Sequence, residues 1–332
     1  MRRMIDVHRR PLLDIASYGR RGPGQRPSLS PAEVAHAVRT ARGAPEVVVK
    51  VSGGASTSKG VRQHLDYIGR EGEQEIEMDD GRLVRESGFE RRVIEDWDLD
   101  LEEQKGSRRR AITTRLKSPK LVHNVVFSMP PGTPPEKVRA AVRKLAQEEF
   151  AFRHRYLMTL HTDQPQPHVH LVLKAVSEQG ERLNIRKATL RAWRQQFAAN
   201  LRELGIDANA TERAVRGVST PRKSDGIYRA AARGASTHFR ERVRMVADEL
   251  LRGGVRLEPG VETLARTRGA VTGGWNATAD ALLAAGRSDE AALVRSFVNR
   301  MSPVQTEKQW IANKLRRSLE AVRARDAPEH AR

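Results

Sequence analysis

Residues 161–170 read His-Thr-Asp-Gln-Pro-Gln-Pro-His-Val-His and hold three of the ten histidines of this 332-residue chain. The flanking segments, 156–163 and 168–176, are rich in apolar and β-branched residues and predict two strands. Two prolines among the four linking residues, 164–167, favour a tight connection. This stretch therefore predicts a β-hairpin whose strands carry histidines.

The expected register places all of these polar side chains on one face. Alternate residues of a strand point to the same side of the sheet, and directly paired residues also share a side. A hairpin that pairs Asp163 with His168 also pairs His161 with His170. The three imidazoles and the carboxylate then converge.

Three neutral imidazoles leave at least one coordination position of a metal ion open, which is typical of a catalytic site. His161, His168 and His170 are therefore candidate metal ligands, and Asp163 is expected to accept the ring N–H of one of them. Imidazole favours Zn, Mn, Co or Ni, whereas a nuclease site accepts Mg when phosphate oxygens complete the shell. The expected cofactor is a divalent metal ion, with Mg or Mn favoured. The alternative is a solvated hairpin whose histidines bind no metal.

The charge balance predicts a polyanionic partner. Lys and Arg outnumber Asp and Glu by 60 to 41, which gives a formal net charge of +19. Such a surface gains affinity for nucleic acid through counterion release.

The chain has no cysteine, which excludes disulfides, thiolate metal sites and a cysteine nucleophile. No apolar run approaches the ~20 residues that span a bilayer, and no signal peptide is recognised, so a cytoplasmic protein without membrane insertion is expected.

Tyr67 is the candidate nucleophile among four tyrosines. A helix is predicted from about residue 58 to 70, and its buried stripe follows an i, i+4, i+7 pattern of apolar residues, namely Val61, Leu65 and Ile68. Tyr67 lies roughly 120° from this stripe, beside His64 and Arg70. A phenol with a pKa of ~10 needs a base or a metal to become nucleophilic, so the tyrosine and the metal site explain each other. The alternative is an ordinary half-exposed helix tyrosine.

Basic side chains near both motifs are candidate DNA contacts. Three lie around the tyrosine and two follow the second histidine strand: Lys59, Arg62, Arg70, Arg186 and Lys187. The alternative for each is a solvated face.

Two motifs in this order resemble the HUH endonucleases, and within them the relaxases of the plasmid-mobilisation group. The family's pattern His-x-Asp-x-x-x-Pro-His-x-His is matched at 161–170, and its nucleophile pattern Leu-x-Tyr-Ile/Leu-x-Arg is matched at 65–70. The segment His123 to Ser128 and the residues Pro131 to Thr133 are similar too. The resemblance covers about residues 46–230 and is closest to the single-tyrosine relaxases.

This resemblance implies an α+β fold, with an antiparallel sheet flanked by helices and a helical C-terminal region. The domains expected are a basic arm at 1–45, a catalytic domain at 46–230 with an exposed insertion at about 71–120, and a helical basic region at 231–332. The implied activity is strand-specific nicking of single-stranded or supercoiled DNA at a transfer origin, with a 5′-phosphotyrosyl bond to Tyr67. Accessory relaxosome proteins, a type IV coupling protein and export to a recipient cell are further implications of the resemblance.

Two other hypotheses remain at this stage. One is a non-enzymatic DNA-binding accessory protein whose histidines hold a structural metal. The other is a rolling-circle replication initiator or transposase with similar active-site parts. The tyrosine precedes the histidine motif, as in relaxases, whereas the order is usually reversed in replication initiators of this superfamily.

Overall fold

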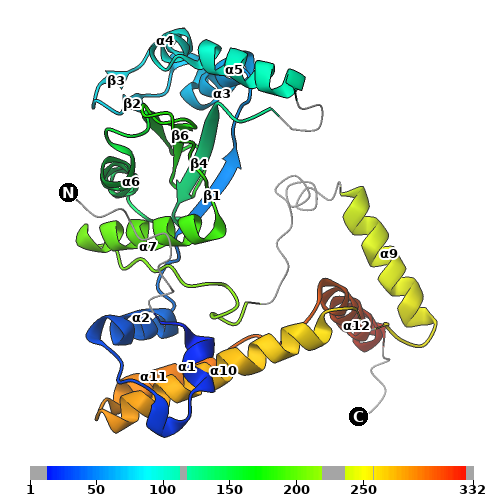
Figure 1. The fold of residues 1–332 in the computed structure, drawn as a ribbon. Coiled ribbons are helices and arrows are strands. Elements are labelled where there is room, and N and C mark those ends of the chain that lie inside the picture. Colours follow the sequence, from blue (N-terminus) through cyan, green and yellow to red (C-terminus); the bar gives the residue numbers. More distant parts are fainter. Residues whose placement is uncertain (1–12, 113–117, 219–235, 257, 327–332) are drawn as a thin grey trace, which may run out of the picture. The chain divides into compact units, whose positions relative to one another are not determined.

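The computed structural model describes residues 13–112, 118–218, 236–256 and 258–326. They form two compact units (Figure 1). Unit 1 contains residues 43–210, and unit 2 combines residues 13–42 with the described residues after 210.

Unit 1 is built on a six-stranded antiparallel sheet with the strand order β1-β4-β6-β5-β2-β3. The strands are β1 (Val48–Gly53), β2 (Ile76–Met78), β3 (Leu83–Val84), β4 (Val122–Ser128), β5 (Tyr156–His161) and β6 (His168–Lys174). The central strands β4, β5 and β6 are almost entirely buried because helices cover both faces. This arrangement confirms the α+β class and the antiparallel sheet flanked by helices.

One face of the sheet packs against α6 (Pro135–Phe150) and α7 (Lys187–Glu203). Aromatic rings contact edge to face in this core, with centroids 5.3 Å apart for Phe127 and Phe197 and 5.5 Å apart for Phe150 and Trp193. The other face packs against α3 (Ser58–Gly69) and α4 (Phe89–Asp96), with α5 (Leu99–Ile112) and the 3₁₀ turn η2 (Arg70–Gly72) beside them. In Figure 1, α3, α4 and α5 gather together at the β2–β3 side, apart from α6 and α7.

The expected hairpin register is wrong by two residues. His161 pairs with His168 and Thr159 pairs with His170, so residues 162–167 form a six-residue connection. A slip by one residue would send every side chain to the opposite face, but a slip by two preserves the faces. The three imidazoles therefore still converge on the side of the sheet that α3 covers.

Residues 71–112 and 118–120, the described part of the segment 71–120 that was expected as an exposed insertion, contribute to the fold. The stretch supplies β2 and β3, and α4 buries Phe89 and Val93 in the core under α3. Its acidic residues meet basic ones elsewhere: Glu75 accepts from Arg139 at 2.6 Å, and Glu77 accepts from Arg143 at 2.7 Å. The charges that suggested a solvated segment thus join it to α6.

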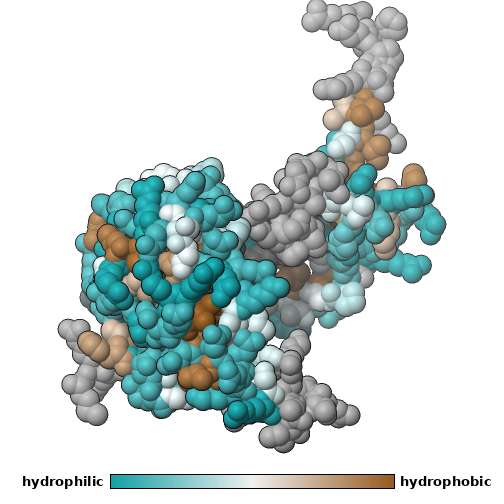
Figure 2. Space-filling view, turned by 90° about the horizontal axis from the view of Figure 1, so that it is seen from above, coloured by the Kyte–Doolittle hydropathy of each residue, from teal (hydrophilic) through white to brown (hydrophobic). Residues whose placement is uncertain are grey.

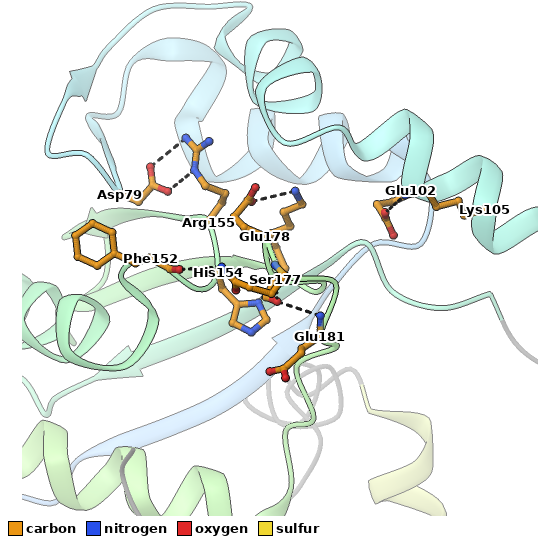
Figure 3. A network of polar contacts seen from close by, with 11 residues as sticks. Asp79, Glu102, Lys105, Phe152, His154, Arg155, Ser177, Glu178 and Glu181 are labelled. Atoms are coloured by element: carbon orange, nitrogen blue, oxygen red, sulfur yellow. Dashed lines mark hydrogen bonds and ion pairs between the residues drawn. The ribbon is translucent and has the colours of Figure 1, made fainter. Parts of the chain in front are cut away.

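A second ion-pair group holds the end of the β5–β6 pair that lies away from the histidines (Figure 3). Arg155 forms an ion pair with Asp79, and Lys174 reaches Glu178 at 3.2 Å. The carbonyl of Lys174 also lies 3.0 Å from Nδ1 of His154. These contacts tie β2 to β5 and fix β6 against the segment that follows it.

Unit 2 is helical and contains residues 13–42 of the segment expected to be an N-terminal arm, whose first twelve residues lie outside the described part of the chain. Its elements are α1 (Ile15–Arg20), the 3₁₀ turn η1 (Pro23–Gln25), α2 (Pro31–Arg42), α9 (Thr237–Leu251), α10 (Val261–Ala284), α11 (Ser288–Asn299) and α12 (Glu307–Asp326). The first two helices share a core with α10 and α11 around Ile15, Tyr18 and Trp275. The described part of the C-terminal region is helical, as expected.

The described surface is mostly hydrophilic. Figure 2 shows teal residues over most of the visible face, with small and separate brown patches. Every helix that the structure describes is too short or too polar to cross a lipid bilayer.

The contact between α1 and α10 depends on two glycines. A Cβ atom on Gly274 would overlap the carbonyl of Ile15, and one on Gly19 would lie 2.5 Å from the backbone nitrogen of Gly274. We expect Gly274→Ala to lower the free energy of unfolding by ~1–3 kcal/mol, because the backbone atoms that the new methyl group meets cannot move aside as side chains can. Urea unfolding followed by circular dichroism measures this.

Gly273→Ala is the matched control, since no atom lies within 4 Å of its added Cβ. It should stabilise α10 by up to about 1 kcal/mol through helix propensity. Equal effects of the two substitutions would contradict the close packing of α1 on α10.

Candidate active site

Three histidines of the β5–β6 hairpin form one cluster. The ring centroids lie 4.7 Å apart for His161 and His170, 5.2 Å for His161 and His168, and 5.3 Å for His168 and His170. One ring nitrogen from each lies within 4.8 Å of the other two, a spacing that could hold a metal ion. His161 is only 2% exposed, whereas His168 is half-buried. The cluster is therefore closed on one side and accessible on the other.

Hydrogen bonds fix the tautomers of two of these rings. Nε2 of His161 lies 2.7 Å from the carbonyl oxygen of Ile68, and Nδ1 of His168 lies 3.1 Å from that of Gln166. A carbonyl only accepts, so both ring nitrogens must carry the proton. The second nitrogen of each ring then presents a lone pair, as a metal ligand requires.

Burial also favours the neutral form of His161 and His170. Burial lowers the pKa of His161, and it lowers the pKa of His170 to about 3, with His161, His168, His64 and Arg70 adding electrostatic repulsion. Burial likewise lowers the pKa of His64, which lies close to this group on α3. Neutral rings suit the expected divalent metal ion, because protonation would remove the lone pair. The donor set therefore fits such an ion.

Helix α3 carries Tyr67 beside this cluster. The helix begins after Thr57, whose side chain accepts from the backbone N–H of Gly60, and it buries the predicted stripe of Val61, Leu65 and Ile68. Tyr67 lies off this stripe and is 62% exposed. The carbonyl that binds His161 belongs to the next residue, Ile68. One hydrogen bond therefore joins the end of the tyrosine helix to the histidine cluster.

Arg70 and Asp163 make a second connection between α3 and the hairpin. Nη2 of Arg70 donates to Oδ2 of Asp163 at 2.6 Å, and the Arg70 guanidinium carbon lies 5.3 Å from the centre of the Tyr67 ring. Arg70 adopts a left-handed backbone with φ 50°, which ends α3 and turns the chain toward the hairpin.

Asp163 does not contact a histidine in the way the sequence suggested. Because β5 ends at His161, Asp163 belongs to the connection and not to the strand, and its carboxylate binds Arg70. Backbone carbonyls accept the ring N–H groups of His161 and His168, and Nδ2 of the Asn124 side chain lies within hydrogen-bonding distance of His170.

The candidate DNA contacts divide into two groups. Lys59, Arg62 and Arg70 lie on or at the end of α3, on the same side of the sheet as the histidines. Arg186 and Lys187 lie at the start of α7 and line an open pocket with Val51 and His123, on the opposite face of the sheet. The structure therefore places only the first group on the face of the sheet that carries the cluster, and Arg70 is the one of the three that acts electrostatically on His161 and His170.

Asn124 is a site residue that the motifs did not single out. Its side chain is 2% exposed on β4, with Nδ2 lying 2.7 Å from Oγ of Ser52 and 3.2 Å from Nδ1 of His170. Asn124 shares one face of β4 with Val122 and Val126, and this is also the face of His170. A polar residue at such an otherwise apolar position was the signal that could have revealed it.

Comparison with known families agrees with this geometry. Residues 67–206 match a family model described as "Relaxase: MobA/VirD2-like, nuclease domain". This stretch is a relaxase nuclease domain. Searches of curated proteins and of solved structures gave no significant match. The relaxase match includes Tyr67, α6 and the whole histidine hairpin, and it assigns the domain to DNA nicking and mobilisation, with DNA as its substrate.

The buried histidines predict a dependence of stability on pH. In the unfolded chain they take up protons near pH ~6.5. In the folded protein burial lowers the pKa of five of them, namely His64, His123, His154, His161 and His170. Below pH ~6.5 the unfolded state therefore binds more protons, and stability falls as the pH falls, by up to about 1.4 kcal/mol per pH unit for each histidine.

Urea unfolding of the metal-free protein in a chelator, between about pH 7 and pH 5, tests this expectation. His170→Asn should make the pH dependence shallower, because His170 has the most strongly lowered pKa in the cluster. A free energy of unfolding that stays constant over this range would contradict the burial of neutral histidines.

Proposed function

We propose that Tyr67 nicks one DNA strand by attacking the scissile phosphate at a metal site formed by His161, His168 and His170. The observation that carries this proposal is the hydrogen bond from His161 to the carbonyl of Ile68, at 2.7 Å. It holds the residue next to Tyr67 against a cluster whose neutral rings suit a divalent metal ion, Mg or Mn, with Zn, Co or Ni as alternatives.

The reaction is an exchange of phosphate esters. The phenolic oxygen of Tyr67 forms a bond to phosphorus, and the bond from phosphorus to the 3′ oxygen breaks. The phenol gives its proton to solvent, and the leaving 3′ oxygen takes one up, so the products are a 5′-phosphotyrosyl bond and a free 3′-OH. A bound metal supplies Lewis-acid polarisation of the non-bridging oxygens.

The residues around the phenol orient it and receive phosphate charge. Arg70 lies against the Tyr67 ring and is held there by Asp163, so Asp163 acts as a positioning residue. Lys59 and Arg62 are exposed on the same helix and contact neighbouring phosphates. Arg186 and Lys187, on the other face, bind DNA away from the scissile phosphate.

The proposed setting is a transfer origin on a plasmid or another mobile element. The relaxase match supports mobilisation. Because the phosphotyrosyl bond conserves the energy of the cleaved ester, the strand can be rejoined after conjugative transfer. We extend the proposal to accessory relaxosome proteins, to a type IV coupling protein, and to cytoplasmic action followed by export with the DNA.

Tyr67→Phe should abolish nicking and covalent attachment. Supercoiled plasmid that carries the DNA flanking the gene is incubated with the protein and Mn, then treated with SDS and protease. Wild-type protein should yield relaxed circles with a blocked 5′ end, because the phenol remains on the phosphate. Tyr156→Phe, a buried tyrosine of the β5 core, is the control and should nick normally. Attachment by Tyr67→Phe at the wild-type level would refute the assignment.

Removal of the metal should stop nicking without releasing the DNA. Chelation or His161→Ala removes polarisation of the phosphate but leaves the basic surface, so binding measured by fluorescence anisotropy should persist. His238→Ala, an exposed histidine on α9, should have no effect. Full nicking in a chelator would exclude a metal-dependent reaction. Tight binding without nicking in any metal would instead favour the accessory DNA-binding hypothesis.

A further inference from the structure

We propose that His64 is a positioning residue of the metal site. Its ring nitrogen accepts a hydrogen bond from the amide nitrogen of Asn124 when the amide oxygen accepts one from the ring N–H of His170. This inference rests on the proposed metal-dependent function. It concerns a side chain on the tyrosine helix that touches neither the phosphate nor the metal.

Two buried polar atoms at this place have unmet hydrogen-bonding capacity. Oδ1 of Asn124 and Nε2 of His64 are both buried and have no well-formed hydrogen bond within the part of the chain that the structure describes. The two side chains are nevertheless close enough to interact, since Asn124 acts on His64 as a side-chain hydrogen-bonding partner. Buried polar atoms without partners are rare and call for a physical reason.

The orientation of the Asn124 amide supplies that reason. In the structure, Nδ2 of Asn124 faces Oγ of Ser52 at 2.7 Å and Nδ1 of His170 at 3.2 Å. An amide nitrogen only donates, so Nδ1 of His170 accepts and the proton lies on Nε2. A ring in this tautomer has no free lone pair for a metal ion. The observed amide orientation therefore belongs to a metal-free state of His170.

Ligation of a metal through Nε2 reverses these roles. Nδ1 of His170 then carries the proton and needs an acceptor, as the second nitrogen of a ligating histidine almost always does. A half-turn of the Asn124 amide brings Oδ1 to face His170 and Ser52, and the serine hydroxyl can donate as well as accept. The same turn directs Nδ2 toward His64, whose neutral ring offers Nε2 as an acceptor. Oδ1 of Asn124 and Nε2 of His64, the two buried atoms without a partner among the described residues, then each take part in a hydrogen bond.

His64 therefore stabilises the orientation of Asn124 that favours the metal. It lies three residues before Tyr67, so both face the same region of α3. The helix that carries Tyr67 thus contacts the metal ligands twice, through Ile68 to His161 and through His64 and Asn124 to His170.

The first test measures the affinity of the full-length protein for Mn²⁺ without DNA, by electron paramagnetic resonance titration. His64→Leu removes the acceptor and should weaken Mn²⁺ binding about 10- to 100-fold. His64→Gln, whose carbonyl can accept from Nδ2, should restore affinity close to that of the wild type. Gln63→Leu, at an exposed position of the same helix, is the matched control and should bind normally.

A second measurement needs no substitution. Nitrogen-15 NMR of the Zn²⁺-loaded protein reports the tautomer of each histidine. The proposal expects a proton on Nδ1 of His170 and a hydrogen-bonded lone pair on Nε2 of His64. A proton on Nε2 of His170 in the loaded protein would overturn it, even if His64→Leu fails to fold.

The outcomes separate this inference from the proposed function. If wild-type protein binds Mn²⁺ and His64→Leu binds it equally well, only the role of His64 is overturned. If the wild type binds no divalent ion at all, the metal-dependent function fails together with this inference. Weak binding by both His64→Leu and His64→Gln would mean that ring packing, and not an acceptor atom, is required, which also overturns the proposal.

Discussion

The hydrogen bond from Nε2 of His161 to the carbonyl of Ile68 is the contact on which the arrangement of the site depends. The carbonyl belongs to the last turn of α3, where helix carbonyls lack a partner within the helix. A buried ring from the sheet supplies the missing donor. The bond fixes the tautomer of a metal ligand and also fixes the end of the helix next to Tyr67. One interaction therefore sets both the ligand and the position of the phenol.

Much of this site follows from the sequence because strand geometry has a period of two. The alternation of His168, Val169 and His170 decides which side chains share a face, whatever the exact pairing. The register itself depends on where the strands end, and the composition of 164–167 did not reveal that residues 162 and 163 also leave the sheet. Convergence of the histidines was therefore predicted correctly, while the partner of Asp163 was not. The stripe of α3 was equally predictable, since three buried residues at helical spacing define a face.

Other parts could not be predicted, because they depend on pairing between distant segments. In the charged stretch after Gly72, Glu75 and Glu77 lie next to or within the short strand β2. They form ion pairs with Arg139 and Arg143 of α6. Composition alone gives such a stretch the same signature as an exposed loop. The segment around Gly19 is similar, because its packing on α10 requires a second glycine, Gly274, more than two hundred residues away.

The three ligand candidates differ in how firmly their tautomers are set, and this difference bears on metal binding. His161 and His168 face backbone carbonyls, which can accept a hydrogen bond but cannot donate one. His170 faces an amide, which offers a donor at one end and an acceptor at the other. Two ligands are therefore organised before a metal arrives, and the third becomes so when the amide turns. Because the ring of His170 is buried and its pKa is lowered to about 3, the choice between its two neutral tautomers, and not its protonation, governs its readiness to bind. His64, which contacts the Asn124 amide, then influences the metal site through Asn124 without being a ligand.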